Sequence, residues 1–161
     1  MENLCFIVLL VFLQASSQFA DSTWSKVVPL RSTRLDVERI LGKNTASPGH
    51  PFVSEHETSD GRISVLYNCC PCHSKGEGEW NVTQETVVAV IVTPKLKLKI
   101  DNLSIKKDDY IIESSHVSGV YTYTNKNEGI TIETNNGNVI SLTYAPKAKE
   151  HSLRCSSIVK K

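Results

Sequence analysis

Alternating apolar and polar positions run through the last third of the chain and predict a β-meander. Residues 120–124, 130–134 and 139–144 each follow a period of two, as strands with one buried face do. The linkers NKNEG and NNGN supply Asn and Gly, which adopt the positive φ that tight hairpins require. We therefore expect three antiparallel strands joined by short turns.

The middle of the chain predicts three further strands. Residues 62–67 alternate, and residues 86–93 form an almost unbroken β-branched run, typical of a central strand buried on both faces. Residues 95–100 read K-L-K-L-K-I, which predicts an edge strand whose lysines discourage pairing with other chains. Residues 43–61 are rich in Pro, Gly, Ser and Thr without a period, so we expect a long loop there.

One helix is predicted near the N-terminus. Thr33, followed three residues later by Asp36, forms a variant of the capping box, and Gly42 is the expected terminator. Val37, Ile40 and Leu41 form one apolar stripe between them. A helix of about two turns is not stable alone, so it must pack on the sheet.

The predicted fold class is α+β, with a short N-terminal helix on an antiparallel sheet that ends in a C-terminal β-meander. Residues 86–97 and 138–149 resemble each other, because each combines a hydrophobic strand, a proline and Lys-x-Lys. A duplicated unit would explain this and would give the fold two similar halves. Chance similarity of two short segments is the alternative.

The N-terminal pattern predicts export. Residues 4–13 form an apolar run too short to cross a bilayer, and small and polar residues follow it. This layout is typical of a secretory signal peptide, which we place at residues 1–20; an uncleaved membrane anchor is the alternative. Residues 21–161 then form a single secreted or periplasmic domain without stable membrane insertion. Asn81 and Asn102 begin glycosylation sequons, which matter only in a host that glycosylates.

The charge balance argues against nucleic acid as the partner. The formal net charge is only +1, so no global field attracts the chain to DNA or acidic lipid. Five lysines could form a basic stripe that binds a polyanion: Lys95, Lys97, Lys99, Lys106 and Lys107. No aromatic residues lie between them, so a solvated edge is the favoured interpretation. The expected partner is another protein.

The cysteines give the sharpest prediction of a site. Cys69, Cys70 and Cys72 lie within four positions, and Cys155 lies far along the chain. Four cysteines remain once residues 1–20 are removed, and an even count in an exported chain predicts disulfides. Four cysteines allow three pairings, which spacing does not distinguish, and the favoured bond is Cys72–Cys155. Cys69 and Cys70 would then be a reduced pair, a vicinal disulfide or an intermolecular link.

Two other kinds of chemistry remain open at this cluster. Cys69 and Cys72 have the C-x-x-C spacing of redox proteins, but no helical pattern follows to lower a thiol pKa. Zinc is the second alternative, with the nearby ligands Cys69, Cys70, Cys72 and His73. Structural zinc sites normally use two separated ligand pairs, so no metal or cofactor is expected.

No other motif suggests catalysis. The chain contains no G-x-S-x-G, Walker, dinucleotide or HExxH motif, and its histidines are scattered. Glu55–His56–Glu57 could bind a metal, although a solvated loop is favoured. Trp24 and Trp80 are expected in the core rather than on a binding face. The chain is therefore expected not to be an enzyme.

Residues 29–42, PLRSTRLDVERILG, resemble the opening of small exported bacterial α+β domains. Thr33, Val37, Leu41 and Gly42 match a capped helix with a central valine and a final Leu-Gly, followed by antiparallel strands. The resemblance is to SmpA/OmlA lipoproteins, to β-lactamase inhibitor proteins and to uncharacterised secreted bacterial proteins. It implies protein–protein interaction through a sheet face without catalysis, and no site residues carry over.

Together these patterns predict an exported, non-enzymatic protein-interaction or cell-envelope module of unknown partner, with the loop at residues 43–61 as a candidate contact segment. The alternative is a thiol–disulfide redox or metal-binding protein that uses the cluster at Cys69–Cys72.

Overall fold

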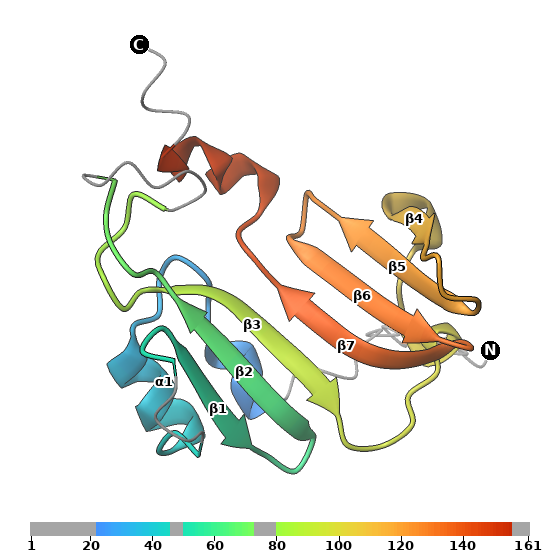
Figure 1. Ribbon diagram of the computed structural model, residues 1–161, viewed down its shortest axis with the longest axis horizontal. Helices are drawn as coiled ribbons and strands as arrows, with labels where there is room; N and C mark the ends of the chain where they lie inside the picture. Colours follow the sequence, from blue (N-terminus) through green and yellow to red (C-terminus); the bar gives the residue numbers. More distant parts are fainter. Residues whose placement is uncertain (1–21, 46–49, 73–79, 156–161) are drawn as a thin grey trace, which may run out of the picture.

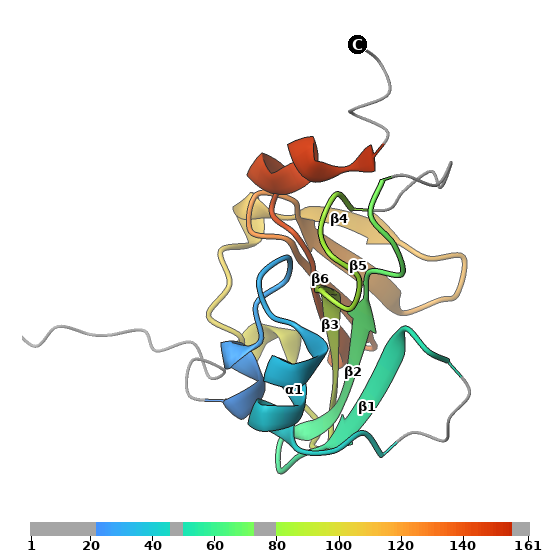
Figure 2. The same cartoon turned by 90° about the vertical axis from the view of Figure 1, so that its left-hand side faces the viewer.

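The computed structural model describes residues 22–45, 50–72 and 80–155. Within them one antiparallel sheet has a short helix, α1 (Arg34–Leu41), against one face (Figures 1 and 2). The strands are β1 (Val53–Glu57), β2 (Gly61–Tyr67), β3 (Val87–Pro94), β4 (Ile111–Ser114), β5 (Val120–Asn125), β6 (Ile130–Asn135) and β7 (Asn138–Tyr144). This confirms the mainly antiparallel sheet with a short N-terminal helix. The predicted signal peptide lies outside the described residues.

The strand order is β1-β2-β3-β7-β6-β5-β4, so two meanders meet at the centre of the sheet. The first meander is β1–β3 and the second is β4–β7. Their last strands, β3 and β7, pair over only three positions, from Val90↔Tyr144 to Val92↔Leu142. The described residues also include four short 3₁₀ helices: η1 (Thr23–Lys26), η2 (Ile100–Asn102), η3 (Lys107–Asp109) and η4 (Ala148–Leu153).

The local sequence explains α1. The Asp36 side chain accepts a hydrogen bond from the Thr33 backbone N–H at 2.9 Å, and the Asp36 backbone N–H donates to Thr33 Oγ1 at 3.4 Å. Gly42 then ends the helix at a φ of 84°, where a side chain would be strained. Val37 is fully buried against the sheet, so the predicted helix, its cap and its core residue are confirmed.

The core lies on the face of the sheet that α1 and η1 cover (Figure 2). Alternate residues of the central strands fill it: Ile63, Val65, Val87, Val90, Val92, Ile132 and Leu142. The expectation that β3 is buried on both faces is wrong, because Ala89 and Ile91, on the opposite face, are only half-buried. The described elements cover one face only.

Two predictions about the middle of the chain are also wrong. The expected loop at residues 43–61 contains β1. The buried positions of β1 are the polar Ser54 and His56, so the strand shows no alternation of apolar and polar residues in the sequence. The expected edge strand at residues 95–100 does not form. The chain bends after Pro94, Leu96 is 80% exposed, and the only pairing in the stretch is an isolated bridge from Lys99 to Asn138.

A polar network closes the core beneath α1. Ser54 Oγ lies 2.9 Å from His56 Nε2 and 2.7 Å from the Tyr67 hydroxyl. Burial lowers the pKa of His56 despite the opposing influence of the Gly42 and Lys43 backbone and of Glu38, so the ring stays neutral. Glu55 and Glu57 lie on the other face of β1, so Glu55–His56–Glu57 does not converge on a metal.

His56 should therefore make the fold sensitive to acid. The unfolded chain binds the proton more readily than the folded chain, because the pKa is lowered only in the folded state. We expect the full free energy of unfolding above pH about 6.5 and a progressive loss below it. Urea unfolding between pH about 7.5 and about 5 measures this loss. A His56→Gln variant should lose less on acidification, and an identical pH profile would contradict the assignment.

Candidate functional site

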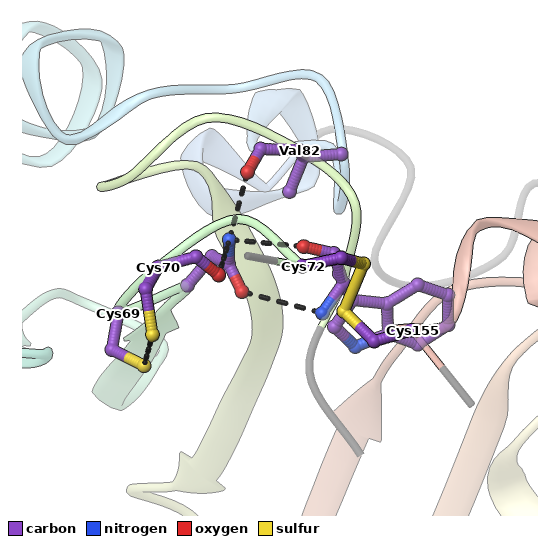
Figure 3. Close-up of a disulfide and its surroundings, with 7 residues drawn as sticks. Cys69, Cys70, Cys72, Val82 and Cys155 are labelled. Carbon is purple, nitrogen blue, oxygen red and sulfur yellow. Dashed lines mark hydrogen bonds between the residues drawn. A yellow bond between two sulfur atoms is a disulfide. The ribbon is translucent and has the colours of Figure 1, made fainter. Parts of the chain in front are cut away.

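The cysteine cluster lies where the chain leaves β2, and it is tied to the C-terminal segment (Figure 3). Cys72 and Cys155 form a disulfide with a Cα–Cα distance of 5.3 Å and an S–S distance of 2.15 Å. This is the pair that the sequence favoured. The bond joins the connection between β2 and β3, within the first meander, to the segment that follows η4 after the last strand of the second meander.

Asn68 organises the backbone around this disulfide. Its side chain is buried, and the two hydrogens of Nδ2 are shared among three carbonyl oxygens, those of Cys70 at 2.9 Å, Trp80 at 3.1 Å and Val82 at 2.9 Å (Figure 3). Its backbone N–H donates to Thr86 O at 2.8 Å. Sequence analysis gave Asn68 no role, because its partners lie up to eighteen positions away and follow no spacing rule.

Replacing Asn68 should destabilise the protein more than its size suggests. Asn68→Ala leaves buried carbonyl oxygens without their donor, and we expect the free energy of unfolding to fall by about 2 kcal/mol. Asn68→Asp is the matched control, because it keeps the shape but replaces the donor with an acceptor. Both variants should lose stability in urea unfolding. Wild-type stability in Asn68→Asp would show that the donor is not needed.

Trp80 anchors the C-terminal segment to the same cluster. The Arg154 guanidinium lies 4.8 Å from the centre of the Trp80 ring, and the His151 ring packs edge-on at 5.9 Å. The Asn81 backbone N–H also donates to Leu153 O at 2.8 Å. Trp24 is buried too, against Tyr144 at 4.9 Å, so the expected core positions of both tryptophans are confirmed.

Cys69 and Cys70 form a second sulfur pair beside the Cys72–Cys155 disulfide, which we call the staple. Their Sγ atoms lie 2.7 Å apart, and both residues are half-buried (Figure 3). Cys72 is bonded to Cys155, so Cys69 and Cys72, which have the C-x-x-C spacing, do not form a disulfide with each other. His73 lies outside the described residues. Within the part of the chain that is described, no three His, Cys, Asp or Glu side chains are placed to hold a metal ion.

The two edges of the sheet differ. At β1, the Glu55 backbone N–H donates to Asn44 Oδ1 at 2.9 Å and its carbonyl accepts from the Thr45 N–H at 2.8 Å, so the preceding segment covers this edge. β4 is the last strand at the other edge, and all four of its residues are exposed. Ile111 is 53% and Ile112 49% exposed, which is high for large apolar side chains.

The apolar edge continues beyond β4. Ile112 pairs with Tyr123 and Ser114 pairs with Tyr121, so Ile112 and both tyrosines share one face. Tyr121 is 43% exposed, and Val117, in the turn that follows β4, is 63% exposed. We call Ile111, Ile112, Val117 and Tyr121 the β4 edge patch.

Two other features, the predicted basic stripe and a cavity, do not suggest a specific ligand or reaction. The proposed basic stripe does not lie on one strand, and Lys107 Nζ binds Asp101 Oδ1 at 2.8 Å, which raises the pKa of Lys107. A cavity of about 540 Å³ lies between η1 and the C-terminal segment. Its lining includes the ion pair of Lys147 and Glu128, and Tyr144, whose pKa burial raises to about 12.

Among the described residues, no helix has the length and apolar character needed to cross a membrane. Comparisons with protein-family models, with curated proteins and with solved structures give no match to this chain.

Proposed function

We propose that the chain is an exported, non-enzymatic interaction domain that binds an extended segment of a partner protein along β4. The observation that carries the proposal is the contrast between the two sheet edges, since Asn44 and Thr45 cover β1 whereas β4 pairs on one side only. An open edge strand offers a row of backbone N–H and C=O groups that an added strand can bind.

The side chains of β4 support strand addition. Ile111 and Ile112 point to opposite faces of the sheet, so an added strand would find an apolar neighbour on each face. Tyr121 extends the contact on the Ile112 face. Backbone pairing then supplies affinity, and the β4 edge patch selects partner segments with apolar side chains.

Export and the absence of catalysis rest on separate observations. The Cys72–Cys155 disulfide is typical of proteins in oxidising compartments, in line with the signal-peptide pattern of residues 1–20. Ser54 and His56 lie within hydrogen-bonding distance, as a nucleophile and base would. Each is only 1% exposed, however, so this pair supports the core rather than a reaction with substrate.

A duplicated origin of the two halves is part of the same proposal. The strand order supports it, because each meander ends in a central strand and the similar segments, residues 86–97 and 138–149, contain β3 and β7. The second meander would then be the half that kept an open edge.

A display experiment tests the binding mode without a known partner. The protein is used to select from a phage-displayed library of random extended peptides, in parallel with Ile112→Lys and with Leu35→Lys as the control on exposed α1. We expect enriched peptides with alternating apolar positions that bind the wild type and Leu35→Lys but not Ile112→Lys. Peptides that bind all three proteins equally, or no enrichment, would overturn the proposal.

A further inference from the structure

The sulfur pair of Cys69 and Cys70 is separate from the structural disulfide and is not explained by the β4 edge. The two side chains come from adjacent residues, yet their Sγ atoms lie 2.7 Å apart, in contact with each other (Figure 3). Both residues are half-buried, so small reagents in solution can reach them, although the surrounding chain covers part of each side chain.

The backbone holds this pair from both sides. On one side, Asn68 is fixed by its backbone N–H to Thr86 O and by its side chain to the Cys70 carbonyl. On the other side, Cys72 is tied to Cys155. Because Cys69 and Cys70 lie between two fixed points, their sulfurs stay within reach of each other, which gives each thiol a high effective concentration toward the other.

We propose that Cys69 and Cys70 form a thiol–disulfide exchange site, which alternates between a dithiol and a vicinal disulfide by reaction with low-molecular-weight thiols and disulfides. This site is independent of strand addition at β4. Its substrates are small disulfides of the glutathione class in one direction and the corresponding thiols in the other.

The exchange balances in two steps. One cysteine, as its thiolate, attacks a sulfur of the small disulfide, so that a mixed disulfide forms and one small thiolate leaves. The neighbouring thiol then loses its proton and attacks the protein sulfur of the mixed disulfide. The Cys69–Cys70 bond forms, the second small thiol leaves with a proton, and the pair has given two electrons to the small disulfide. Two small thiols reverse both steps.

The Cys72–Cys155 bond is placed to stay out of this exchange. Cys155 is only 4% exposed, and Arg154, the residue before it, packs on the Trp80 ring, whereas Cys72 is half-buried like the pair. Thiol–disulfide exchange requires access to the sulfur that is attacked. Attack on Cys155 is therefore hindered, and Cys69 and Cys70, which have two accessible sulfurs, should react before the Cys72–Cys155 disulfide does.

The test uses the purified protein in a series of buffers with different ratios of reduced to oxidised glutathione. After an acid quench, differential alkylation and peptide mapping report the state of each cysteine. We expect Cys69 and Cys70 to be alkylated together or not at all, with a two-electron dependence on the ratio, while Cys72–Cys155 stays intact. A pair that stays entirely oxidised or entirely reduced across the series would contradict exchange.

Single serine variants provide the matched controls. In Cys69→Ser and Cys70→Ser, the remaining thiol has no neighbour to attack the mixed disulfide, so a glutathione adduct should accumulate that the wild type lacks. Phenylarsine oxide, which binds two thiols at once, should bind the reduced wild type in a 1:1 ratio and neither variant. A stable glutathione adduct on the wild type, cross-linked dimers, or exchange with Cys72 would each overturn the proposal.

Discussion

Replacing both Cys72 and Cys155 with serine is expected to cost about 4.5 kcal/mol in free energy of unfolding, the largest effect of any change considered. The disulfide joins residues 83 positions apart, so breaking it restores a large amount of freedom to the unfolded chain. Without the disulfide, only noncovalent contacts, such as those of Arg154 and His151 with Trp80, would hold the C-terminal segment in place.

Urea unfolding of the double variant and of the wild type, both with intact Cys69 and Cys70, measures this cost. The control is Cys69→Ser combined with Cys70→Ser, which keeps the staple and should change the free energy of unfolding by less than about 1 kcal/mol. If the two double variants lose equal stability, the Cys72–Cys155 bond is not the main staple of the fold.

Gly61→Ala is expected to be the next most damaging change, with a loss of about 3 kcal/mol. Gly61 begins β2 at a φ of 152°, and an added Cβ would lie 2.1 Å from Thr93 O and 2.9 Å from the backbone N of Lys95. Both atoms belong to the backbone at the end of β3, so the strands would have to separate to make room. The cost combines this overlap with the strain of a side chain at positive φ.

Gly42→Ala separates these two causes. Gly42 also has a positive φ, of 84°, but nothing lies within 4 Å of the position where its Cβ would be built. The Gly42→Ala variant should therefore lose only the free energy that corresponds to the strain of a side chain at positive φ, about 1 kcal/mol. Thermal unfolding of the two variants compares them directly, and equal midpoints would mean that the close approach to β3 relaxes without cost.

Local patterns in the sequence predicted those parts of the fold whose causes are local. α1 depends on Thr33, Asp36 and Gly42, which lie within ten residues, and the meander of β5–β7 depends on alternation and on short Asn-Gly turns. β1 escaped prediction because its buried residues, Ser54 and His56, are polar. They bond to each other, and Ser54 also bonds to the Tyr67 hydroxyl, which a different strand supplies.

The remaining errors have two physical causes. Residues 95–100 have the alternation of a strand, but after the chain bends at Pro94 they pair with a neighbouring strand only through the isolated bridge from Lys99 to Asn138. β4 is short and exposed on both faces, so it leaves no mark of burial in the sequence. At the site, the even number of cysteines in an exported chain favoured a Cys72–Cys155 disulfide, whereas the role of Asn68 depends on carbonyl groups brought near by the fold.

The short ladder between β3 and β7 also has a consequence for the order in which the protein folds. Each meander contains hairpins between strands that follow each other in the chain, and such local contacts close quickly. The three pairs between Val90–Val92 and Leu142–Tyr144 bring together residues that are distant in the chain, so their loop-closure cost is higher. We therefore expect docking of the two meanders to be the slow step, with the whole second meander already synthesised before the sheet can close.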